Sequence, residues 1–170
     1  MKHIKIFDKS RRILDGDFDV AVTPANDYLG VAKIHEIITY IFVEHCDLLR
    51  EQNKIRAENK IKAFDTFLLS PKKGVNPFLM IGVLPIAANK NSKEQLVQFY
   101  RSVFEKASEN KLKSLRLPSL AEGVYHYEKD DVVHIGLAIA SEYPGIQIEF
   151  YCYNDEYYHM FSERLASLKV

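Results

Sequence analysis

The chain has 170 residues, of which 47% are hydrophobic and 12% aromatic, so it can bury a core and is not a disordered segment. Its 23 Lys and Arg residues balance 23 Asp and Glu residues, and this neutral charge disfavours a general nucleic-acid binder, which normally carries a basic excess. The sequence contains no run of about 20 apolar residues, so we expect no membrane-spanning segment.

The remaining composition indicates one domain without a metal site. Cys46 and Cys152 stand far apart and give neither a disulfide framework nor the spacing of a zinc site. Cys152 falls in an apolar stretch, which predicts a small core residue. The N-terminal MKHIKIFDKS lacks the hydrophobic run of a signal peptide. We therefore expect a single domain over residues 1–170, cytoplasmic by default and without a cofactor, while export without a classical signal stays open.

The first half of the chain predicts four strands and one long helix. Residues 31–50 predict the helix, because the stretch is too long and continuous for one strand and carries an apolar stripe at Ile34, Ile37, Ile38, Ile41 and Phe42. The second strand is buried and ends at Thr23-Pro24. The four strands are expected at residues 3–7, 19–22, 64–69 and 78–84.

The second half of the chain alternates helices with strands. Residues 91–110 form the clearest helix, in which Ser92 and Gln95 predict a capping box. The other elements are a strand at 114–118, a helix at 128–141, a strand at 146–153 and a final helix at 155–168. This alternation predicts the α/β class, a three-layer α/β/α sandwich with a mixed central sheet and parallel pairing where helices cross over.

The stretch SLRLPSLAEGVYHYEKDD, residues 114–131, is a strand–loop–helix unit. Leu115 and Leu117 alternate with polar residues, and Pro118 ends ladder donation. Gly123 permits a turn, and the acidic residues that follow suit the first turn of a helix. Such loops, at the carboxyl ends of strands in an α/β sheet, are where ligands usually bind.

Four stretches, in this order, resemble the macro domain family of ADP-ribose-binding folds over nearly the whole chain. DVAVTPANDYLGVAKIH is similar to the family's strand, Asn-Ala-Ala-Asn turn and glycine-rich loop. The loop in SLRLPSLAEGVYHY is similar to its Ser-Thr-Gly-Val-Tyr-Gly phosphate loop. The other two, FLMIGVLPI and IQIEFYCYNDEYYHMFSERL, are similar to a strand that ends in Val-Gly-Pro and to the last strand and helix.

The resemblance assigns a role to each part of a ligand site. Asn26 matches the asparagine that contacts the distal ribose, and Asp8 matches the aspartate that reads the adenine, with the Gly16-Asp17-Phe18 stretch as the rival match. Residues 29–31 stand at the first phosphate loop and 121–125 at the second, which wraps the diphosphate. The complete set is Asp8, Asn26, Leu29, Gly30, Val31, Ala121, Glu122, Gly123, Val124, Tyr125, Tyr153 and Asn154.

Each assignment has a plainer structural alternative. Asn26 and Gly123 are common turn residues, and Tyr125 and Tyr153 could be packing aromatics. Tyr153 and Asn154 match the aromatic and polar pair beside the adenine. Glu122 is unusual beside a diphosphate, which its carboxylate would repel.

The chain also departs from the family pattern. Thr23 replaces the first asparagine of the turn, the glycine-rich loop is reduced to Gly30, and Ala32 or Lys33 stands where hydrolytic members carry an aspartate. The resemblance thus implies a binding module for ADP-ribose or a related nucleotide, free or attached to protein, with weak or absent catalysis. The alternatives are an ADP-ribosyl or O-acetyl-ADP-ribose hydrolase with a relocated base, such as His126 or Asp27, and a scaffold that has lost the ligand.

Overall fold

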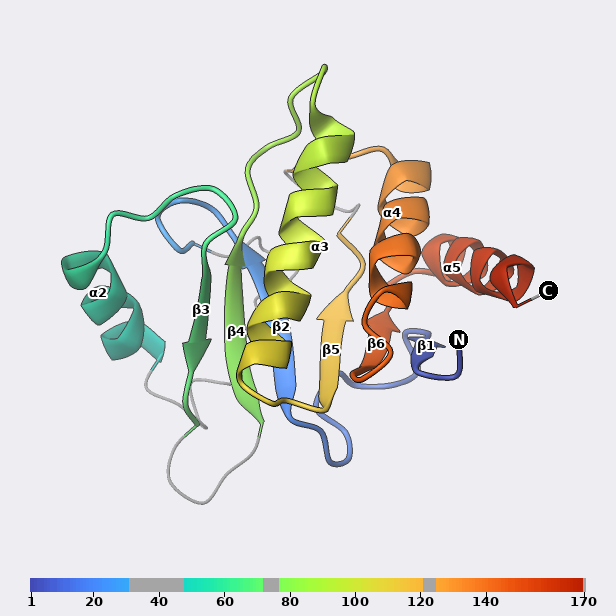
Figure 1. The fold of residues 1–170 in the computed structure, drawn as a ribbon, viewed down its shortest axis with the longest axis horizontal. Coiled ribbons are helices and arrows are strands. Elements are labelled where there is room, and N and C mark those ends of the chain that lie inside the picture. Colours follow the sequence, from blue (N-terminus) through green and yellow to red (C-terminus); the bar gives the residue numbers. More distant parts are fainter. Residues whose placement is uncertain (31–47, 72–76, 121–124, 170) are drawn as a thin grey trace.

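The structure is a computed structural model that describes residues 1–30, 48–71, 77–120 and 125–169 (Figure 1). A six-stranded sheet with the order β1-β6-β5-β2-β4-β3 forms its centre. The strands are β1 (Ile4–Phe7), β2 (Val20–Ala25), β3 (Thr66–Leu69), β4 (Phe78–Val83), β5 (Ser114–Pro118) and β6 (Gln147–Tyr151).

Five of the six strands run in the same direction. Only β3 is antiparallel, on β4, whereas the β1–β6, β6–β5, β5–β2 and β2–β4 pairs are parallel. The carboxyl ends of β1, β2, β4, β5 and β6 therefore meet at one edge of the sheet, which is the upper edge in Figure 1.

The described helices are α2 (Leu48–Glu58), α3 (Ser92–Glu109), α4 (Lys129–Ser141) and α5 (Asp155–Leu168). Figure 1 shows α3 and α4 side by side on the front face of the sheet, with α5 beside α4 and α2 at the β3 end. The expected α/β sandwich with a mixed central sheet is confirmed. Within the described ranges, no helix is both long enough and apolar enough to cross a membrane.

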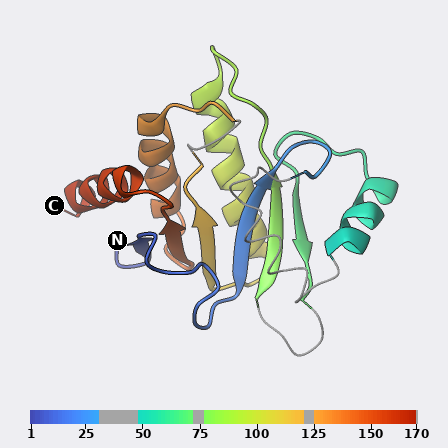
Figure 2. The same cartoon turned by 180° about the vertical axis from the view of Figure 1, so that it is seen from behind.

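Both faces of the sheet are buried. On the front face, Val20 and Val22 of β2 pack with the aromatic stripe of α3, which includes Phe99, Tyr100 and Phe104. The opposite face, toward the viewer in Figure 2, carries a second cluster of apolar side chains. Its members include Ala21, Ala25, Leu79, Ile81 and Val83 from β2 and β4, Ile13 and Phe18 from the segment after β1, and Ile55 of α2 at its margin.

Three sequence-based expectations for these elements were wrong. The last residues of the helix expected over 31–50 belong to α2, which begins at Leu48 and ends at Glu58, not at Arg50, because most of the residues after Arg50 are good helix formers. Residues 31–47 of that prediction lie outside the described residues. The capping box is absent, since Asn91 is the N-cap of α3 and no side chain caps it. The Gln95 side chain instead accepts the Ala88 N–H at 2.9 Å.

The third correction concerns β2. The sequence suggested that this strand stops before Thr23-Pro24, but β2 includes both residues and ends at Ala25. It continues because its register with β4 runs without a break from Val20↔Phe78 to Ala25↔Val83. The proline therefore lies inside a central strand, which bears directly on the site.

Candidate functional site

The loops that leave the parallel strands gather along one sheet edge. Asp8 follows β1, Ser119 follows β5 and Asn26 follows β2. Backbone hydrogen bonds join neighbouring strands at this edge. Cys152 N–H donates to Phe7 C=O at 2.9 Å, and Leu84 N–H donates to Ala25 C=O, also at 2.9 Å. The predicted site residues among the described ones thus lie on one edge in the order β1, β6, β5, β2.

The direction in which the chain adds successive strands to the sheet changes at the boundary between β5 and β2. The chain runs outward from β2 to β4 and then crosses back to β5 and β6, so the β5–β2 boundary is a topological switch point. Pairing there is short: Val20↔Leu115 and Ala21↔Arg116 are the only paired positions, although both strands continue. The two strands part toward their carboxyl ends, which is where open α/β sheets place their ligands.

Two prolines account for this parting. In a parallel strand, the N–H and C=O of one residue point to the same neighbour, and successive residues alternate. The Ala25 C=O faces β4, because it accepts the Leu84 N–H, so Pro24 faces β5. Pro24 has no N–H to donate across the β5–β2 boundary.

The same reasoning applies on the other side of the boundary. Ser119 N–H donates to Tyr151 C=O at 2.9 Å, on the β6 side, so Pro118 faces β2. Pro118 and Pro24 therefore remove two of the N–H donors that could extend the ladder at this end. The ladder between β2 and β5 therefore ends at this boundary, here called the opening, while β2 stays paired with β4 and β5 with β6.

Asn26 closes the loop at the end of β2. Its side-chain Oδ1 accepts the N–H of Tyr28 at 3.0 Å and that of Gly30 at 2.9 Å. These two bonds fix the amide plane through Oδ1, and neither of them uses Nδ2. No hydrogen-bond partner of Nδ2 is found within the described residues, and the residue is exposed. Asn26 thus acts as a turn residue through Oδ1 and presents a free donor through Nδ2.

Of the predicted phosphate loop, residues 121–125, only Tyr125 is described, and Ser119 precedes the loop. Ser119 is 1% exposed, and its Oγ has no hydrogen-bond partner in the part of the chain that the structure describes. Ala121, Glu122, Gly123 and Val124, like Val31 of the first loop, lie outside the described residues.

The tyrosines after this loop are packed inward. Tyr125 is 3% exposed, and its burial raises its pKa to about 12. Tyr127 donates its hydroxyl to the Pro85 C=O at 2.7 Å, and the Tyr125 C=O accepts the Ala87 N–H. These contacts join the segment after β4 to the segment before α4. The structure therefore gives the Tyr125 side chain a packing role in the core.

The β1 and β6 ends carry the predicted adenine side. Asp8 accepts hydrogen bonds from the Ser10 hydroxyl and the Ser10 N–H, and these hold the Asp8 pKa below its ordinary value. Tyr153 is half-buried, and Asn154 is the N-cap of α5, where its Oδ1 accepts the Tyr157 N–H at 2.9 Å. The structure therefore gives Asn154 a capping role.

A buried arginine that the sequence analysis did not single out holds the segment after Asp8. Arg116 of β5 pairs through Nε with the Glu149 carboxylate at 2.7 Å. Its Nη1 donates to the carbonyls of Ile13 and Asp15, and its guanidinium lies 3.8 Å from the centre of the Phe18 ring. In the sequence, Arg116 has only the signature of an outward polar strand residue, so no pattern there indicates its burial.

A metal centre of the usual kind is not seen in the described ranges, because no three His, Cys, Asp or Glu side chains gather in them to hold an ion. The polar groups described at this edge include the Asp8 carboxylate, the Asn26 amide, the Ser119 hydroxyl and backbone groups. Such groups suit a polar organic ligand with hydroxyls and phosphates.

Comparison with known proteins agrees with this geometry. A family model described as "Macro domain" matches residues 29–136. A macro domain-containing protein from Cupriavidus necator is 28% identical over 97 residues, a match that covers 53% of this chain and 56% of that protein. The chain therefore spans little more than half the length of this relative.

Solved structures show the same fold. The Oceanobacillus iheyensis macrodomain with MES bound superposes with a TM-score of 0.78 at 22% identity, over 97% of this chain and 90% of that one. A mutant of that macrodomain with ADPR also gives 0.78, at 21% identity, over 97% and 91%. The Trypanosoma brucei macrodomain in complex with ADP gives 0.77 at 20% identity, over 96% and 69%. The chain belongs to the macro domain family.

Proposed function

We propose that the protein is a binding module for ADP-ribose, free or attached to a protein. The observation that carries this proposal is the proline-lined opening between β2 and β5, at the switch point of a macro domain sheet. Two of the similar macrodomains are described as complexes with ADPR or ADP, and their fold is the one observed for this chain.

The site's dimensions suit an elongated ligand. Three strand-to-strand steps separate Asp8, at the end of β1, from Asn26, at the end of β2. At ~4.8 Å for each step the separation is at least roughly 14 Å, because β5 and β2 are unpaired at this end. In this proposal the adenine lies near Asp8 and Tyr153, the diphosphate lies over the opening, and the distal ribose meets Asn26 Nδ2. Backbone N–H groups of a glycine loop can hold phosphates without lysines, which agrees with the neutral chain.

We assign binding rather than hydrolysis to this site. Ala32 or Lys33 stands at the place of the family's catalytic-type aspartate, so no carboxylate is expected where a general base would act. Asp27 and His126 are exposed in the structure, and no hydrogen bond within the described residues orients either side chain toward the opening.

The test is calorimetric titration of the purified protein with ADP-ribose, with ADP and AMP as comparators. We expect binding in the micromolar range for ADP-ribose, weaker binding for AMP, and a loss of ADP-ribose binding in Gly123→Glu. An absence of heat and of thermal stabilisation at millimolar ADP-ribose would contradict the proposal.

Asn26 allows a sharper version of this titration. In Asn26→Asp, a carboxylate oxygen can still accept the N–H groups of Tyr28 and Gly30, but the Nδ2 donor is replaced by a negative oxygen. We expect ADP-ribose to bind at least about tenfold more weakly, because one hydrogen bond is lost and a charge repels the diphosphate. Asn110→Asp, at the C-cap of α3 and thus at the opposite edge of the sheet, is the matched control and should leave the affinity unchanged.

A further inference from the structure

The loop that carries Asn26 is held by α2 as well as by its own bonds. Asn26 Oδ1 accepts two loop N–H groups, Leu29 N–H donates to Asn26 C=O at 2.9 Å, and Asn26 N–H donates to Gly30 C=O at 3.0 Å. Within residues 28–30, these bonds leave two carbonyls, those of Tyr28 and Leu29, that Asn26 does not satisfy.

Two side chains of α2 satisfy those carbonyls. Gln52 Nε2 donates to Leu29 C=O at 2.8 Å. Arg56 donates through Nε at 2.8 Å and through Nη2 at 2.6 Å to Tyr28 C=O, and its Nη1 donates to Asn53 Oδ1 at 3.1 Å. Gln52 and Arg56 are four residues apart and so share one face of α2.

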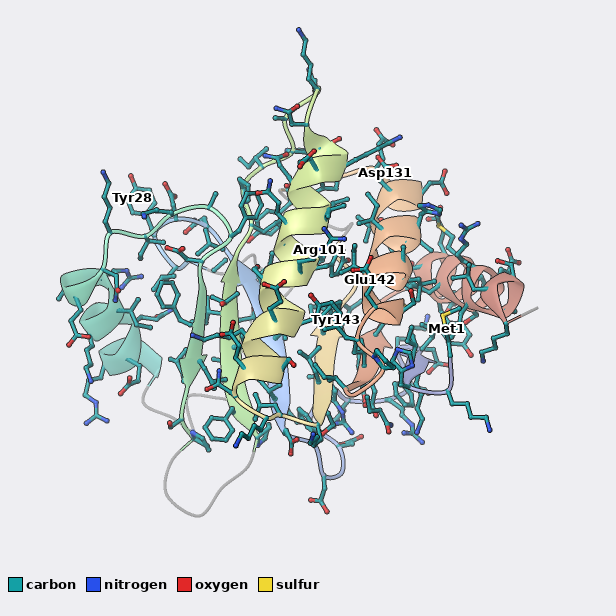
Figure 3. All side chains as sticks on the ribbon, viewed as in Figure 1. Met1, Tyr28, Arg101, Asp131, Glu142 and Tyr143 are labelled. Atoms are coloured by element: carbon teal, nitrogen blue, oxygen red, sulfur yellow. The ribbon has the colours of Figure 1, made fainter. Side chains whose placement is uncertain are left out.

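Together these contacts satisfy every backbone N–H and C=O of residues 28–30. The bonds also hold an unfavourable conformation, because Leu29 has φ of 61° while its side chain is completely buried. A leucine in the left-handed region stays there only when its surroundings determine it. Figure 3 shows Tyr28 at the α2 end of the molecule, where the residue is 74% exposed although its carbonyl accepts two hydrogen bonds.

We propose that Gln52 and Arg56 are positioning residues that hold loop 26–30 closed and so keep Asn26 Nδ2 directed at the ligand. The inference rests on the proposed ADP-ribose site, and neither residue is required to touch the ligand. Its physical basis is pre-organisation: if the loop is competent for only a fraction of the time, the apparent dissociation constant rises by the inverse of that fraction.

The variants are Gln52→Ala, Arg56→Ala and the pair together. Arg56 is exposed and Gln52 is only partly buried, so we expect the chain to fold in each case. The affinity for ADP-ribose should fall about five- to tenfold in Arg56→Ala and further in the pair. Arg56→Lys, which keeps the charge and one donor, should restore part of the affinity.

The matched control is Lys54→Ala. It removes the same positive charge from the same helix, and within the described part of the chain no hydrogen bond or ion pair joins the exposed Lys54 to loop 26–30. This control should bind ADP-ribose like the wild type. If Lys54→Ala weakens binding as much as Arg56→Ala does, general charge explains the effect and the positioning role is overturned.

The comparison with AMP separates positioning from general damage. AMP lacks the distal ribose that Asn26 is proposed to meet, so its affinity should be unchanged in the α2 variants. An equal loss for AMP and ADP-ribose, or no loss for either, would overturn the inference.

Amide hydrogen exchange tests the inference without any ligand. The N–H groups of Tyr28, Leu29 and Gly30 should be protected in the wild type and should exchange at least about tenfold faster in the double variant, while the strands keep their protection. If the wild type fails to bind ADP-ribose, the proposed function fails, and exchange alone then decides the inference. Faster exchange in residues 28–30 would support the positioning role of Gln52 and Arg56, and unchanged exchange would overturn it.

Discussion

The buried Arg116–Glu149 pair gives the strongest stability prediction. Both side chains are nearly covered, with 7% and 9% of their surface exposed. In Glu149→Gln the volume is kept and the carboxylate charge is lost, so the guanidinium stays buried without its counter-ion. Breaking a buried pair in this way costs about 3–5 kcal/mol.

The surroundings of Arg116 set the expected value within that range. The guanidinium keeps two carbonyl acceptors, those of Ile13 and Asp15, and the face of the Phe18 ring. We therefore expect Glu149→Gln to lower the free energy of unfolding by about 3 kcal/mol, at the lower end of the range. For a domain of this size, that loss corresponds to a decrease in Tm of roughly 6–12 °C.

The assay is urea unfolding followed by circular dichroism, with a matched surface pair as control. Arg101 and Glu142 lie 3.3 Å apart between α3 and α4, at the positions labelled in Figure 3, and their side chains are 48% and 49% exposed. Glu142→Gln makes the same chemical change and should cost about 0–1 kcal/mol. A loss below about 1 kcal/mol in Glu149→Gln, equal to that in the control, would refute the buried-pair reasoning.

Three further predictions follow from individual side chains. Tyr100→Phe should raise the free energy of unfolding by about 1–3 kcal/mol in urea titrations, because the buried Tyr100 hydroxyl has no hydrogen-bond partner within the described residues; a destabilised variant would argue for a hidden partner. Ser10→Ala should raise the Asp8 pKa toward 3.8 in an NMR titration, and an unchanged pKa would contradict the role of the Ser10 hydroxyl. In the wild type, the contribution of Asp8 to stability is present above pH 3.8 and is lost as the pH falls through the lowered Asp8 pKa. The raised Tyr125 pKa of about 12 contributes stability that is complete below pH 10 and is lost as the pH rises toward 12. The phenolate absorbance of Tyr125, isolated by comparison with Tyr125→Phe, should therefore have its midpoint near pH 12, and a midpoint near pH 10 would mean that the ring is exposed.

Much of the fold could be predicted from the sequence, because the strands carry clear apolar patterns. The last strand, the last helix and the acidic first turn of α4 are examples. The same reasoning was wrong at β2, where Pro24 reads as a strand end. Pro24 lies inside the strand because its missing N–H faces the open side of the sheet, and only the strand order reveals which side that is.

The candidate site was predictable only in part. The resemblance to macro domains pointed to Asn26 and Asp8, and both lie on the expected edge. Arg56 and Gln52 could not be found in this way, because their partners are backbone carbonyls more than 20 residues earlier in the chain. A polar helix with Gln and Arg four residues apart looks like an ordinary solvated face, and the contact appears only once α2 is placed beside loop 26–30.

The central claim is that ADP-ribose binds where β2 and β5 part, and a crystal structure of the complex tests it most directly. The proposal predicts the diphosphate over the opening between Pro24 and Pro118, with Asn26 Nδ2 within hydrogen-bond distance of a distal ribose hydroxyl. The adenine should lie on the β1–β6 side, near Asp8. A ligand bound at another face of the sheet, or one that leaves Asn26 Nδ2 without a contact, would contradict the account.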